Sequence, residues 1–87
     1  MYNVIYTLNV EVISFVKNSL KIARVGVDLT QQQLAEKTGV TRQTISLIEK
    51  GKYNPSLKLC LQICYAVNKS LDEIFWIDKE EWENEEN

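Results

Sequence analysis

The chain has 87 residues, of which 45% are hydrophobic and 25% are charged, and its formal net charge is −2. This length and composition are typical of one folded domain and argue against a second domain, a disordered chain or a membrane span. The charge is uneven: residues 16–58 carry eight Lys and Arg against three acidic residues, whereas residues 78–87 carry six acidic residues against one Lys, so a basic middle that suits nucleic acid precedes an acidic tail.

Residues 1–15 form an N-terminal extension with a pattern of its own. From Tyr2 to Val12 apolar and polar residues alternate, with Ile5 as the exception, and a period of two predicts a β-strand. The segment lacks the basic start and the continuous apolar run of a secretory signal. We therefore expect a protein of the cytoplasm.

Helical spacing begins near Ser14 and predicts a first helix from about Phe15 to Val25. Its expected inward stripe consists of Val16, Leu20, Ala23 and Val27. Its expected outward residues are Lys17, Lys21 and Arg24.

Two further helices meet at a glycine. Thr30 and Gln33 have the spacing of a capping box, which predicts the start of the second helix. Gly39 ends that helix, because the tight turn that follows needs a residue that accepts a positive φ. Thr41 then caps a third helix that runs to about residue 50, where Gly51 stops it. The expected inward residues of these helices are Leu34, Ala35, Ile45 and Ile48.

A fourth and a fifth helix complete the pattern. After a loop at residues 52–55, Ser56 caps the fourth helix and Asn68 closes it, and Ser70 with Glu73 forms the capping box of a short fifth helix. The predicted apolar positions are Leu57, Leu59, Cys60, Ile63, Cys64, Val67, Leu71, Ile74 and Phe75. We expect the acidic tail, residues 78–87, to be frayed, because its like charges repel one another.

The run from Leu29 to Leu57, LTQQQLAEKTGVTRQTISLIEKGKYNPSL, resembles the lambda-repressor-like or Cro-like helix-turn-helix domain, also called the XRE family. The resemblance covers roughly residues 16–77, and TRQTI, IEKGKYNPSL and a closing DEIF are similar to motifs of small stand-alone bacterial and archaeal regulators. It implies an all-α, five-helix domain that binds a double-stranded DNA operator sequence-specifically as a homodimer and acts as a repressor. The helix that starts at Thr41 would enter the major groove.

The resemblance also implies a set of DNA-contacting residues. Those facing the bases would be Thr41, Arg42, Gln43, Ser46 and Leu47. Those facing phosphates would be Gln31, Lys50, the backbone N–H of Gly51, Lys52, Tyr53 and Asn54. The chemistry agrees, because Arg and Gln can form paired hydrogen bonds that single out guanine and adenine. For Leu47 two roles stay open, contact with a thymine methyl group and packing on a neighbour.

No residue pattern points to an enzyme, a metal site or a cofactor. The chain has no His, no cysteine set beside a base and no phosphate-binding Gly loop. Cys60 and Cys64, four residues apart on a predicted helix, are expected to be small buried hydrophobic residues. Trp76 and Trp82 could anchor a partner chain or cover the edge of the core. We expect no small-molecule effector.

The sequence leaves two alternatives open, one for residues 1–15 and one for the function. Residues 1–15 precede the usual start of the family near Val16, so they are either an added strand that pairs with its counterpart in a dimer and covers Ile22 and Val25, or residues upstream of a natural start at Val16. Two alternative functions also remain. A DNA-binding antitoxin would bind a toxin through the tail or the N-terminal segment, and a protein-interaction adaptor would reuse the fold without DNA.

Overall fold

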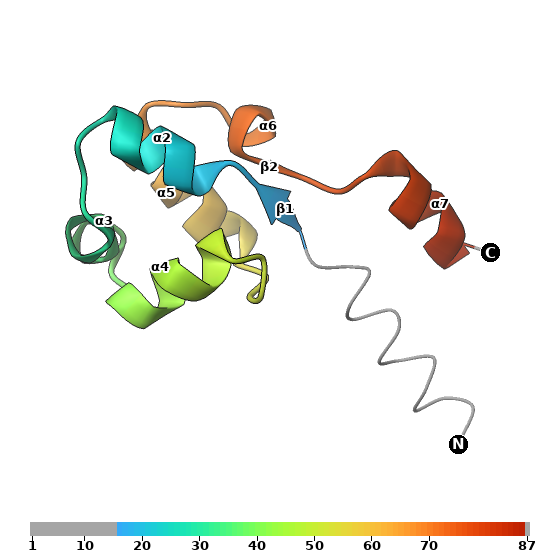
Figure 1. The fold of residues 1–87 in the computed structure, drawn as a ribbon, viewed down its shortest axis with the longest axis horizontal. Coiled ribbons are helices and arrows are strands. Elements are labelled where there is room, and N and C mark those ends of the chain that lie inside the picture. Colours follow the sequence, from blue (N-terminus) through green and yellow to red (C-terminus); the bar gives the residue numbers. More distant parts are fainter. Residues whose placement is uncertain (1–15, 87) are drawn as a thin grey trace, which may run out of the picture.

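The computed structural model describes residues 16–86, so the strand expected within residues 1–15 lies outside the described residues. The elements in chain order are β1 (Lys17–Asn18), α2 (Leu20–Gly26), α3 (Gln31–Thr38), α4 (Arg42–Glu49), α5 (Leu57–Val67), α6 (Leu71–Ile74), β2 (Phe75–Trp76) and α7 (Lys79–Glu86). Helices α2 to α6 pack together as one body, and β2 leads outward from this body to α7 (Figure 1). Of the described helices, none has the length and apolar character that a membrane span requires.

The first helix begins later than predicted. It starts at Leu20 rather than near residue 15, and residues 17–18 form β1 instead. This strand pairs antiparallel with β2, so that Lys17 lies opposite Trp76 and Asn18 opposite Phe75. The strand depends on the return of the chain at residues 75–76, and a helical apolar spacing cannot reveal such a distant partner.

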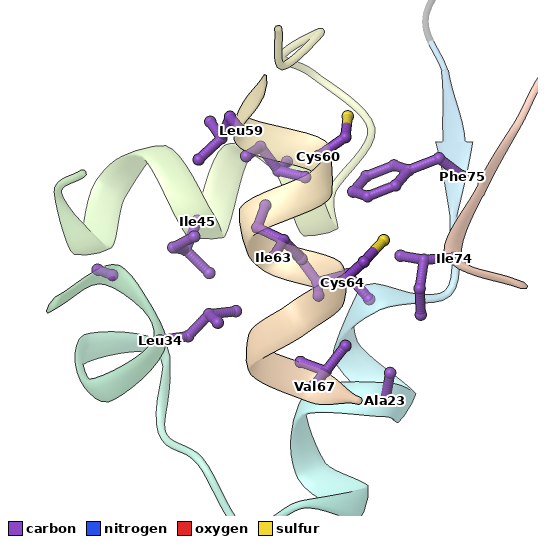
Figure 2. Packing of buried hydrophobic residues seen from close by; sticks show 13 residues of the cluster. Ala23, Leu34, Ile45, Leu59, Cys60, Ile63, Cys64, Val67, Ile74 and Phe75 are labelled. Atoms are coloured by element: carbon purple, nitrogen blue, oxygen red, sulfur yellow. The ribbon is translucent and has the colours of Figure 1, made fainter. Parts of the chain in front are cut away.

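The core surrounds α5, which contacts α2, α3 and α6, while α4 packs against α2 and α3. Figure 2 shows the apolar side chains converging on this helix, with Ile63 near the middle and Phe75 beside the two cysteines. The fully buried large side chains are Leu20, Leu34, Ile45, Ile48, Ile63, Val67 and Ile74. Burial of each contributes about 1.5–3 kcal/mol. Most predicted inward residues are confirmed, but Leu57 is 64% exposed and Val27, expected on the inward stripe of the first helix, is 38% exposed.

The predicted helix ends of the central motif are confirmed. The hydroxyl of Thr30 accepts a hydrogen bond from the N–H of Gln33 at 3.0 Å, and the side chain of Gln33 accepts one from the N–H of Thr30 at 2.9 Å. Gly39 has a φ of 72°, in the left-handed region that a residue without Cβ enters readily. Ser56, Asn68 and the box of Ser70 with Glu73 also take their expected places.

The acidic segment that was expected to be frayed contains a helix, α7, over Lys79–Glu86. The N–H of Trp82 donates to the carbonyl of Asp78 at 3.0 Å in its first turn. Repulsion between the carboxylates is offset, because Glu and Lys are good helix formers and Asp78 stands where a negative charge favours a helix N-terminus. An ion pair between Lys17 and Asp78 joins the start of this segment to β1.

Candidate nucleic-acid interface

Helix α4 presents its N-terminal turn to solvent. Thr41, Arg42 and Gln43 are exposed, and Ser46 and Leu47 in the next turn are partly exposed. The opposite side of the helix is buried through Ile45 and Ile48. The hydroxyl of Thr41 accepts from the N–H of Thr44 at 3.1 Å and thereby caps the helix. All five predicted base-contacting residues therefore lie on one accessible helix that is anchored along its other face.

The C-terminal end of α4 is held by a buried ion pair. Arg24 was predicted to face solvent, and that prediction is wrong, because the residue is only 9% exposed. Its Nε donates to Oε2 of Glu49 at 2.6 Å and its Nη2 to Oε1 of Glu49 at 3.3 Å, while its Nη1 donates to the carbonyl of Leu29 at 2.8 Å. The helical pattern around Arg24 could not show that Glu49, 25 residues later, supplies the opposite charge.

Glu49 also orients Gln31, the predicted phosphate contact at the start of α3. The Nε2 of Gln31 donates to Oε1 of Glu49 at 3.0 Å. An amide nitrogen carries two donors, so Gln31 keeps a second N–H that a phosphate oxygen could accept. The first backbone N–H groups of a helix also lack partners within the helix and favour a negative charge. Partly exposed Gln31 is thus placed at a site that suits a phosphate.

The loop after α4 carries the other predicted phosphate contacts. Lys50, Lys52, Tyr53 and Asn54 are exposed. The N–H of Gly51, however, already donates to the carbonyl of Ile48 at 2.9 Å, so this group closes the helix rather than contacting a phosphate. The side chain of Asn54 has a structural partner as well, because its Oδ1 accepts from the N–H of Val16 at 2.8 Å.

The candidate phosphate contacts and the candidate base contacts lie at opposite ends of α4. Gln31 reaches Glu49 at the end of the helix, and the loop of residues 50–54 follows directly. The candidate phosphate contacts therefore gather at the C-terminal end of α4, whereas Arg42 and Gln43 lie at its start. One end can fix the position of the helix on a nucleic-acid backbone while the other reaches into a groove.

Asn18 is a residue of this region that the sequence analysis missed. Its Nδ2 donates to the carbonyl of Ile48 at 2.7 Å, and its Oδ1 accepts from the N–H of Leu20 at 3.0 Å. One side chain thus joins the end of α4 to the start of α2. The signal that could have found it is the pair Asn18 and Ser19 just before an apolar stripe, because such residues are typical of helix starts.

The two cysteines lie in the core, as predicted. Burial raises the pKa of the Cys60 thiol, and the neighbouring Cys64 raises it further. Burial also raises the pKa of Cys64, with a smaller contribution from Glu73. Thiols with raised pKa values stay protonated at neutral pH and are poor nucleophiles and metal ligands. In the described residues, no three His, Cys, Asp or Glu side chains are grouped as a metal site would require.

Known proteins share both the sequence and the arrangement of this region. Residues 20–74 match the family model described as Helix-turn-helix. The HTH-type transcriptional regulator YgzD of Bacillus subtilis is 45% identical over 64 residues, which cover 74% of this chain and 97% of that protein. The HTH-type transcriptional regulator MJ0272 of Methanocaldococcus jannaschii is 49% identical over 65 residues, which cover 75% of this chain and 98% of that protein.

Solved structures of two regulators are similar to this chain. The restriction-modification controller protein C.AhdI from Aeromonas hydrophila is 30% identical with a TM-score of 0.58, over 62% of this chain and 78% of that chain. The clp gene regulator ClgR from Corynebacterium glutamicum is 28% identical with a TM-score of 0.60. The match covers 62% of this chain but only 57% of ClgR.

Proposed function

Because the chain belongs to the lambda-repressor-like helix-turn-helix family of DNA-binding transcriptional regulators, we propose that α4 reads an operator in the major groove with Thr41, Arg42 and Gln43. The observation that carries this proposal is the exposed first turn of α4, where Arg42 and Gln43 stand side by side on a helix whose other face is buried. A guanidinium and a carboxamide in such a position can form two hydrogen bonds each with guanine and adenine. Ser46 and Leu47 would meet the bases one turn later.

A second group of residues would hold the phosphates. Gln31 offers an amide N–H that Glu49 orients, and Lys50, Lys52, Tyr53 and Asn54 are exposed in the loop after α4. Contacts of this kind fix the position and orientation of a protein on the duplex without reading its sequence. Binding would consequently weaken steeply as the salt concentration rises, because binding releases cations from the DNA and this release is less favourable at high salt.

Two copies would occupy a two-fold operator and repress transcription by blocking the polymerase. A single recognition helix reaches only a few bases, and pairing two copies would place the half-sites about one helical turn, roughly 34 Å, apart. Within each copy, the buried ion pair of Arg24 and Glu49 fixes the orientation of α4 against α2. A regulator of this kind acts in the cytoplasm, and it needs neither a catalytic site nor an effector.

The test is selection of bound sequences from a random pool of duplexes. We expect the wild-type chain to enrich a two-fold motif that contains a guanine, and Arg42→Ala to lose the preference at that guanine. The matched control is Lys69→Ala, which removes an exposed cation beside the end of α2 and should leave the motif intact. Failure of the wild-type chain to enrich any motif, at low salt, would overturn the proposal.

A further inference from the structure

The segment from Phe75 to Glu86 forms an arm that leads away from the helical body (Figure 1). It carries three large apolar side chains outside the core: Trp76 is 42% exposed, Ile77 41% and Trp82 52%. Exposed apolar groups gathered on one segment mark a surface that another molecule covers. The base of the arm is fixed, because β2 pairs with β1 and Asp78 forms an ion pair with Lys17.

A second uncovered apolar surface lies on α5. Leu57, Leu61 and Tyr65 follow one another at intervals of four residues, so they share one face of the helix. They are 64%, 42% and 87% exposed, respectively, whereas Ile63 faces the core. We name these three residues the α5 stripe. Exposed Lys58 lies beside the stripe, and no residue of α5 is acidic.

We propose that the arm of one copy packs on the α5 stripe of a second copy, and that the exchange is reciprocal. The two surfaces complement each other, because both are apolar and their charges are opposite: α7 contains five glutamates and one lysine, whereas α5 contains one lysine. This inference rests on the proposed operator-binding dimer and identifies the segments that hold it together. A two-fold exchange makes each contact twice and covers both sets of apolar groups.

The arm fits a second copy better than its own body. Only two residues, Ile77 and Asp78, separate β2 from α7, and Asp78 is held by Lys17. To fold back onto its own α5, the arm would have to give up this ion pair or the pairing of β2 with β1. An arm that already points outward can instead reach a neighbour without any rearrangement of the body.

The exchange is also compatible with DNA binding. Figure 1 shows α7 on the opposite side of the body from the start of α4. The arm of each copy therefore leaves Arg42 and Gln43 of that same copy uncovered. The acidic α7 would be repelled by phosphates, so a basic and apolar protein surface is a more favourable neighbour for it than the duplex.

Tryptophan fluorescence provides a direct test, because the only two tryptophans of the chain, Trp76 and Trp82, are both in the arm. On concentrating the full chain without DNA, we expect monomers to become dimers by sedimentation. Over the same concentrations the emission should shift to shorter wavelengths and acrylamide should quench it less. A dimer that leaves the emission unchanged, or a chain that stays monomeric, would overturn the inference.

Variants test the two surfaces separately. Leu61→Glu places a negative charge on the α5 stripe and should raise the dimer dissociation constant about tenfold or more. The matched control is Ile22→Glu, which changes a 78% exposed apolar residue on α2 and should leave both dimerisation and emission unchanged. Circular dichroism verifies that both variants are folded. Equal weakening by the two variants would contradict a specific role of α5.

Mixing distinguishes exchange between copies from other kinds of pairing. Full-length Trp82→Ser lacks the apolar residue of α7, and Leu61→Glu lacks an intact α5 stripe, so each should dimerise weakly. A mixture retains one intact arm and one intact stripe in each mixed pair, so we expect the mixed dimer to be more stable than either parent. No gain on mixing would refute the exchange.

Failure of this inference can be told apart from failure of the proposed DNA function. If Leu61→Glu is a monomer that still selects one half-site, the proposed DNA function holds without the exchange. A stable dimer that selects no DNA would reject only that function.

Discussion

Arg24 and Glu49 form a two-point ion pair inside the domain, with Nε of Arg24 2.6 Å from Oε2 of Glu49 and only 11% and 5% of the two side chains exposed. The pair joins α2 to the last residue of α4, and Gln31 adds α3 through its own hydrogen bond to Glu49. Three helices are thus tied together at one carboxylate. This arrangement sets the orientation of α4 relative to the rest of the domain.

Removal of one partner of this pair should be far more costly than removal of both. We expect Arg24→Met to destabilise the fold by about 3–5 kcal/mol, because it leaves the carboxylate of Glu49 buried without a counter-charge. The double variant Arg24→Met with Glu49→Leu should recover a large part of that loss. Urea unfolding of the variants measures the difference. Simple addition of the two single effects would show that the charges do not interact.

Arg42 and Lys52 should affect DNA binding in different ways. Arg42→Ala should cost about 1–3 kcal/mol on the selected operator and much less on random duplex, because it removes hydrogen bonds to a base. Lys52→Ala should weaken binding to both duplexes equally. It should also reduce the slope of log K against log salt concentration by about one, because one fewer counterion is released on binding. Titrations at several salt concentrations measure both quantities. Equal losses for both variants on both duplexes would contradict the assignment.

Replacement of Gly39, at the end of α3, should destabilise the fold through backbone conformation alone. A Cβ at Gly39 would meet nothing within 4 Å, yet its φ of 72° is unfavourable for other residues. We expect Gly39→Ala to destabilise the fold by about 1–2 kcal/mol. The control is Gly26→Ala, where the space is equally open and the backbone is helical, and where Ala should be neutral or stabilising by up to about 1 kcal/mol. Thermal unfolding compares the two. Similar melting temperatures would exclude a conformational role for Gly39.

The capping box of α6 should make stability depend on pH in the acid range. The backbone N–H of Ser70 donates to Glu73 and holds the pKa of this carboxyl below its ordinary value of 4.5. A lowered pKa in the folded state stabilises the fold above the unfolded value, and this contribution is lost as the pH falls through the folded value. Glu73→Gln should therefore differ most from the wild type near neutral pH, and the difference should narrow below about pH 4.5. Melting temperatures across this range test the sign.

Truncation before Val16 separates the two explanations for residues 1–15. If the arm joins the two copies, the chain that starts at Val16 should keep the dimer mass and the tryptophan emission of the full chain. The N–H of Val16 should still reach Oδ1 of Asn54, so the loop after α4 should be retained as well. A truncated chain that becomes monomeric would instead favour an N-terminal strand as the dimer contact.

Local patterns were sufficient to predict the helix-turn-helix itself. The hydroxyls of Thr30 and Thr41 cap backbone groups within three residues, and Gly39 ends its helix through its own φ. Interactions of such short range leave a signature in the adjacent residues, so the bounds of α3 and α4 could be predicted from the sequence. The accessible position of Arg42 and Gln43 followed in the same way, because buried Ile45 and Ile48 fix which face of α4 points outward.

Tertiary structure decided the features that depend on residues far apart in the chain. Arg24 is buried because Glu49 folds against it, and residues 17–18 form a strand because residues 75–76 return beside them. In each case the local pattern favoured another outcome, an outward cation and a longer helix. A distant counter-charge or a free strand edge changes the balance of desolvation and hydrogen bonding, and only the folded chain brings these groups together.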